Sequence, residues 1–108
     1  MHRQDRPRRV REREGGTEAV RHTRLILEKV FNERMAQHGR FGEQDHSDEE
    51  WLTILVEEVG EAAKAILKEA THAGLEMELI QIAAVAVAWH EARWRRSEKP
   101  QASGRADR

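Results

Sequence analysis

Apolar residues recur at helical spacing along three segments of the chain. We expect the first helix to run from Thr17, a suitable N-cap, to about His38, with Gly39 ending it. Its apolar positions are Val20, Ile26 or Leu27, Val30, Phe31 and Met35. The apolar positions of the second segment alternate steps of three and four, which is typical of a packing seam: Leu52, Leu55, Val59, Ala62 and Ile66.

The boundaries of the other two helices can be read with different precision. Ser47-Asp-Glu-Glu50 is a capping box and predicts a sharp start to the second helix. A break at about Thr71–Gly74 separates it from a third helix, expected from about Leu75 to Arg95. That helix is apolar nearly all round, so it must be covered on several sides. We therefore predict an all-α fold in which an antiparallel helical hairpin and an N-terminal helix complete a helical bundle by oligomerisation, as a homodimer or homotetramer.

The charge distribution divides the chain into three parts. Nineteen Lys and Arg nearly balance twenty Asp and Glu over the 108 residues, but residues 1–16 and 93–108 are basic while the middle is acidic. Residues 1–16 are expected to be a flexible basic arm, residues 17–96 the helical domain and residues 97–108 a flexible polar tail. The arm suits either solvent exposure or contact with nucleic acid.

Composition excludes several classes of protein. The chain has no cysteine, which excludes disulfides and thiol catalysis and agrees with a cytoplasmic location. Its N-terminus is charged and has no apolar signal region. The longest uncharged run, Leu79–His90, is too short to span a membrane, and no membrane association is expected.

Two polar pairs, made of three glutamates and one glutamine, interrupt the apolar helices. Glu58 and Glu61 share one face of the second helix, and Glu78 shares a face of the third with Gln81. Antiparallel packing can bring these pairs together across a groove, where like charges repel and raise each other's pKa. Solvated surface glutamates are the competing interpretation, but a carboxylate in so apolar a helix needs a partner. Oxygen ligands of this kind suit Mg²⁺ or Mn²⁺.

The same residues carry a resemblance to a known family. Trp51–Ala65 and Glu78–Trp89 look like the MazG-like branch of the all-α nucleoside triphosphate pyrophosphohydrolases, and Phe41–His46 is similar to a segment preceding that motif. The family hallmark is Glu-x-x-Glu on one helix followed by Glu-x-x-Asp on the next. Glu58, Glu61 and Glu78 match it, whereas Gln81 stands where the family has Asp.

The resemblance implies a hydrolase. Glu58, Glu61, Glu78 and Gln81 would be the Mg²⁺ ligands, and water would attack a nucleoside triphosphate to release pyrophosphate and the monophosphate. Glu57 is the candidate general base or a further ligand. Gln81 contributes no negative charge, so metal binding would be weaker. The alternative is a non-catalytic helical dimer that binds nucleotide or a protein partner.

Other polar residues are candidate substrate contacts. Arg40, Lys64 and Lys68 suit phosphate and Gln44 and His46 suit a base, with surface or loop roles as the alternatives. Trp51 and Trp89 are expected in the core or an interface. No shared ligand spacing connects His22, His72 and His90, and they receive no role.

Overall fold

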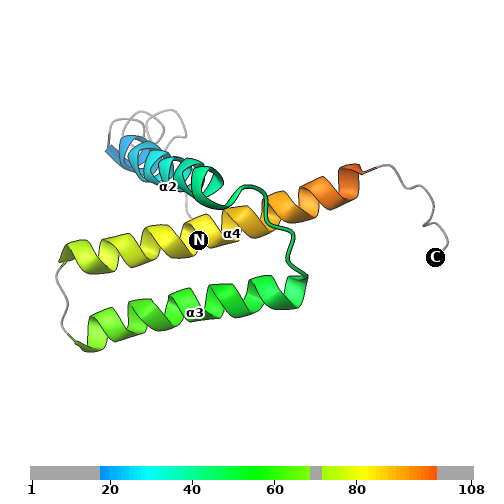
Figure 1. The fold of residues 1–108 in the computed structure, drawn as a ribbon. Helices are drawn as coiled ribbons and strands as arrows, with labels where there is room; N and C mark the ends of the chain where they lie inside the picture. Colours follow the sequence, from blue (N-terminus) through cyan, green and yellow to red (C-terminus); the bar gives the residue numbers. More distant parts are fainter. Residues whose placement is uncertain (1–17, 69–71, 100–108) are drawn as a thin grey trace, which may run out of the picture.

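Three α-helices make up the structure, a computed structural model that describes residues 18–68 and 72–99 (Figure 1). They are α2 (Val20–Phe41), α3 (Asp48–Leu67) and α4 (His72–Glu98). No strand occurs in these residues, which confirms the all-α class. None of the three helices carries an apolar stretch that would let it cross a membrane.

The end of α2 corrects one prediction. The helix passes through Gly39 and continues to Phe41, and Gly42 terminates it with φ 68° and an amide that donates to the His38 carbonyl at 2.9 Å. A residue with positive φ favours glycine, so Gly42 rather than Gly39 provides the stop. Thr17, the predicted cap, lies outside the described residues.

The start of α3 agrees with the capping box. The Ser47 hydroxyl accepts a bond from the Glu50 amide at 3.1 Å, and the Glu50 carboxylate accepts one from the Ser47 amide at 2.9 Å.

The α4 boundaries are wider than predicted. Ala73 and Gly74 are helical rather than part of a break, and Ser97 and Glu98 belong to the helix rather than to the polar tail.

Helices α3 and α4 form the antiparallel hairpin, and α2 crosses α4 on its other side without contacting α3 (Figure 1). Trp51 is buried against Val85, Ala88 and Ala92 of α4. Asp48, the first residue of α3, accepts bonds from the Trp89 indole at 2.9 Å and from Arg93 at 2.7 Å. The core position of Trp51 and the packing of Trp89 beside it agree with the sequence analysis.

The contact between α2 and α4 centres on Arg34. Its guanidinium is buried, bonds to the Glu91 carboxylate and lies 3.2 Å from the His38 ring nitrogen. Val30 is the only apolar residue of α2 that is buried. Most of the large apolar side chains of α2 remain exposed: Val20, Leu25, Ile26, Leu27, Phe31, Met35 and Phe41.

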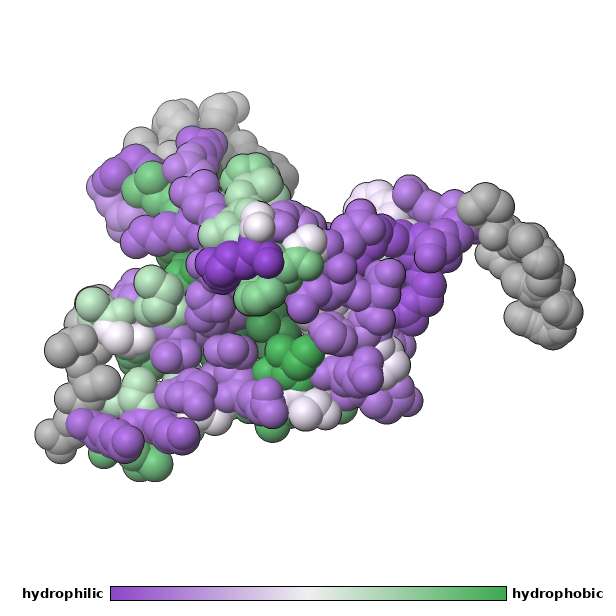
Figure 2. All heavy atoms as spheres, viewed as in Figure 1, coloured by the Kyte–Doolittle hydropathy of each residue, from purple (hydrophilic) through white to green (hydrophobic). Residues whose placement is uncertain are grey.

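The predicted seam of α3 is buried only in part. Ala62 is buried and Leu55 packs against the core, but Leu52, Val59 and Ile66 are about half exposed. The packed side of α3 instead follows Trp51, Leu55 and Ala62, with Glu58 between them at the same helical spacing. On the face shown in Figure 2, apolar side chains reach the surface over both α2 and α3.

Candidate functional site

The two predicted polar pairs lie on the facing helices: Glu58 and Glu61 on α3, and Glu78 and Gln81 on α4. Glu58 and Glu78 are both half-buried, whereas Glu61 is exposed. Burial and the nearby charges of Glu78 and Glu61 raise the pKa of the Glu58 carboxyl, with smaller contributions from Glu57 and Glu33. Glu58 on α3 is therefore close enough to Glu78 on α4 for their charges to repel each other.

The position of Glu58 in α3 explains why its pKa is raised. It occupies a place in the packed stripe of α3 that an apolar residue would otherwise fill, so packing removes water from its carboxylate. Glu61 projects one turn later, outside this stripe, and pairs with the Lys64 ammonium at 3.4 Å. The negative charge of Glu61 is thus offset by solvent and by Lys64, whereas that of Glu58 is less accessible to solvent.

Helix α2 contributes a further carboxylate, Glu33, which the sequence did not reveal. Glu33 of α2 accepts a bond from the Gln37 amide at 3.0 Å and lies 3.5 Å from the Arg40 guanidinium. Gln81, Gln37 and Arg40 together lower the pKa of Glu33, with Gln81 making the largest contribution. The sequence signal was the polar pair Glu33 and Gln37, spaced i,i+4, whose members each follow a buried residue of α2 by three positions.

Gln81 is engaged by side chains of α2. The Gln37 amide nitrogen lies 3.4 Å from the Gln81 side-chain oxygen and also donates to the Glu33 carboxylate at 3.0 Å. Gln81 therefore sits at the junction of the predicted metal ligands and α2. We define Glu58, Glu61, Glu78, Gln81 and Glu33 as the acidic cluster.

The remaining candidates are placed differently. Arg40 borders the acidic cluster through Glu33, and its guanidinium also stacks over Phe41 at 5.2 Å. Lys64 is paired with Glu61, and Lys68 ends α3 as an exposed residue. Glu57 is exposed and lines a shallow hollow with residues near the start of α3.

The two base-recognition candidates take part in local contacts. His46 lies edge-on to the Trp51 ring with centroids 4.8 Å apart, and its Nδ1 is 3.6 Å from the Glu50 carboxylate. The Gln44 carbonyl accepts a bond from Arg95 at 3.0 Å. These contacts hold the loop between α2 and α3 against α3 and α4.

The chemistry of the acidic cluster suits a hard divalent cation, because carboxylate and amide oxygens supply the donors and the charges repel one another. Within the described ranges, no three Asp, Glu, His or Cys side chains converge tightly enough to hold an ion. Binding would therefore require side-chain rotation, which the exposed Glu61 allows. Comparison with family models, curated proteins and solved structures found no match.

Proposed function

We propose that the protein is a Mg²⁺-dependent nucleoside triphosphate pyrophosphohydrolase of the MazG-like type, acting in the cytoplasm. The observation that carries the proposal is the half-buried Glu58 carboxylate, held among Glu61, Glu78 and Glu33 with its pKa raised. A chain gains nothing in stability by placing such a group in a helix seam. A bound cation would offset the repulsion and give the position a use.

The ligands would be Glu58, Glu61, Glu78 and Gln81. When bound, Mg²⁺ or Mn²⁺ supplies charge neutralisation for the triphosphate and a more acidic water. Glu57, one residue from Glu58, remains the proposed general base, and Arg40 borders the site as a proposed phosphate contact. Lys64 and Lys68, near the C-terminal end of α3, stay proposed phosphate contacts. Lys64 would leave its pairing with Glu61 if that carboxylate bound a metal. Gln44 and His46 stay proposed base contacts.

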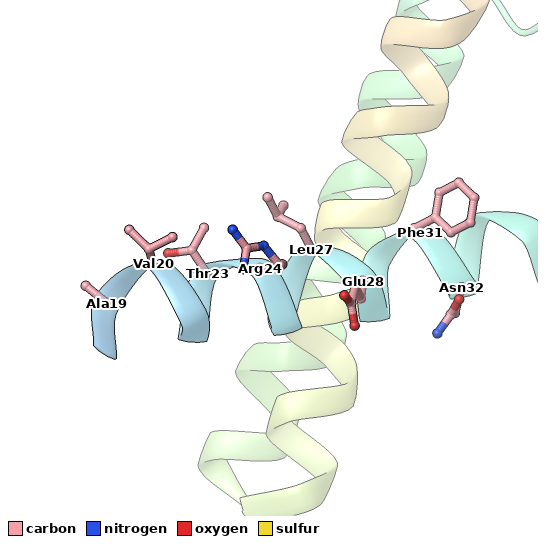
Figure 3. Close-up of a pocket in the computed structure, with 8 residues that line it drawn as sticks. All are labelled: Ala19, Val20, Thr23, Arg24, Leu27, Glu28, Phe31 and Asn32. Carbon is pink, nitrogen blue, oxygen red and sulfur yellow. The ribbon is translucent and has the colours of Figure 1, made fainter. Parts of the chain in front are cut away.

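Oligomerisation is the second part of the proposal. Leu52, Val56, Val59 and Ile66 form an exposed apolar stripe along α3, which neither α2 nor α4 covers. Figure 3 shows a further apolar surface on α2, where Val20, Leu27 and Phe31 line a hollow built from this one helix. A second copy of the chain would cover such surfaces and complete a bundle. A homodimer is the simplest such assembly, and a homotetramer is the alternative.

The activity is tested by pyrophosphate release. The purified chain is incubated with a panel of ribonucleoside and deoxyribonucleoside triphosphates, with Mg²⁺ or with a chelator. We expect metal-dependent formation of monophosphate and pyrophosphate, lost in Glu61→Ala and retained in Glu98→Gln, because Glu98 is exposed at the opposite end of α4 from Glu78. No release from any nucleotide would contradict the proposal and favour a non-catalytic helical dimer.

A further inference from the structure

The hollow on α2 carries two opposite charges within an apolar surface. Its apolar part is made by Val20, Leu27 and Phe31, whose side chains are between 45% and 60% exposed and project to the same side of the helix (Figure 3). Arg24 and Glu28 line the same hollow, and both are exposed. Among the described residues, neither of these two forms an ion pair. We call the five residues the α2 face.

The α2 face has the spacing of a seam between two helices. Its central residues follow one another by steps of four, three and four, the spacing with which helices pack side by side: Val20, Arg24, Leu27 and Phe31. Within the described part of the chain, α2 contacts only α4, and the residues it buries there are Val30 and Arg34. The α2 face is therefore uncovered, and an arginine in such a seam needs an acid on the surface that covers it.

A second copy of α2 supplies that acid when the two helices run antiparallel. In a parallel alignment Arg24 would lie beside Arg24 of the second copy, and the like charges would repel. The antiparallel alignment that brings Val20 beside Phe31 of the second copy also brings Arg24 beside Leu27 and Glu28 of that copy. Two-fold symmetry repeats the contact, so each Arg24 meets a Glu28. The α2 face is thus complementary to itself in charge as well as in apolar surface.

We propose that the α2 face binds the α2 face of a second copy of the chain in an antiparallel arrangement, with the Arg24 guanidinium of each copy paired to the Glu28 carboxylate of the other. The inference rests on the oligomer of the proposed function. It adds which surfaces meet and which charge pair fixes their direction. It depends neither on the exposed stripe of α3 nor on metal binding.

The test exchanges the two charges in the full chain and follows association by sedimentation velocity. Glu28→Arg and Arg24→Glu each place like charges in the contact, so each is expected to weaken association by about tenfold or more. Lys29→Glu is the matched control, because Lys29 is exposed on the same helix and lies outside the α2 face. Circular dichroism checks that all variants remain helical.

Restoring opposite charges should restore association. An equimolar mixture of Glu28→Arg with Arg24→Glu is expected to regain the size of the unmodified species, since both contacts in the mixed pair then join opposite charges. The double variant Arg24→Glu/Glu28→Arg is expected to regain it alone.

The other outcomes separate the inference from the proposed function. If Glu28→Arg sediments like Lys29→Glu, the α2 face is not an interface, while an oligomer formed through the α3 stripe stands. If the single variants dissociate but neither their mixture nor the double variant associates, Arg24 and Glu28 do not meet and the inference is wrong. A monomeric unmodified chain would overturn both the inference and the proposed oligomer, without bearing on pyrophosphate release.

Discussion

At the scale of the residue, Glu58 shows a conflict between packing and charge. Its neighbours in the α3 stripe, Leu55 and Ala62, pack toward α4, while Glu58 brings a carboxylate into the same contact. Burial and the other acids both disfavour its ionised form. A raised pKa in the folded state means that the ionised carboxylate destabilises the metal-free protein.

We predict that Glu58→Gln raises the melting temperature of the metal-free protein at neutral pH by a few degrees. The sign follows from linkage: the folded state binds this proton more tightly, so stability increases as pH falls through the raised pKa toward 4.5, the ordinary value of a glutamate. The advantage of the variant should therefore shrink in melts near that pH. The same variant should lose metal-dependent activity. A lower melting temperature at neutral pH would contradict the argument.

Glu58, Glu61 and Glu78 could be predicted from the sequence because spacing along a helix fixes which residues share a face. Glu33 could not be predicted, since its place beside α4 depends on the angle at which α2 crosses that helix. The crossing depends on the loop after Phe41 and on the buried Arg34, and neither has a periodic signal. The bond from Gln37 to Gln81 is likewise a tertiary contact that spacing along one helix does not specify.

At the scale of the element, side-chain caps and backbone conformation set the helix boundaries. Residues 47–50 predicted the start of α3 correctly because both bonds of a capping box are local. The end of α2 was predicted three residues early, because Gly39 and Gly42 are equally suitable from composition. Only the backbone decides between them: Gly42 has φ 68° and ψ −159°, a region almost restricted to glycine.

Alanine substitutions at these two glycines should have opposite effects. Gly42→Ala is expected to lower the free energy of unfolding by about 1–3 kcal/mol, because alanine is strained at that φ and ψ. Gly39→Ala is expected to raise it by about 0.5–1 kcal/mol, since alanine favours a helix interior. A Cβ at either position meets no atom within 4 Å, so backbone conformation alone separates them. Urea denaturation measures both changes, and equal effects would contradict the boundary at Gly42.

At the scale of the whole molecule, few apolar side chains are buried. Among the described residues the buried apolar set is Val30, Trp51, Ala62, Ala84, Val85, Ala88 and Ala92. Four of these seven are alanines, which bury little area each, while larger apolar residues remain exposed on all three helices. Helix α4 was predicted to need cover on several sides, and of the described helices α2 and α3 contact it.

We expect the unmodified protein to sediment as a dimer or a larger species. Val56→Lys introduces a charge into the exposed stripe of α3 and should shift the protein toward monomer, since burying an unpaired ammonium is costly. Thr53→Lys is the control, because Thr53 is exposed on the same helix outside the stripe. Sedimentation velocity distinguishes the species. A monomeric unmodified protein would refute the oligomer, and equal behaviour of the two variants would exclude this stripe as the interface.

Because α2 contacts α4 and not α3, it is the helix that can separate while the hairpin stays intact. The pair of buried Arg34 with Glu91 joins α2 to the hairpin, so loss of this pair would favour the opening of α2. Amide hydrogens of α2 are therefore expected to exchange with solvent faster in Arg34→Met, while those at the Trp51 core change little. How often α2 opens would thus depend on one ion pair more than on apolar packing, because Val30 is the only apolar residue of α2 that is buried.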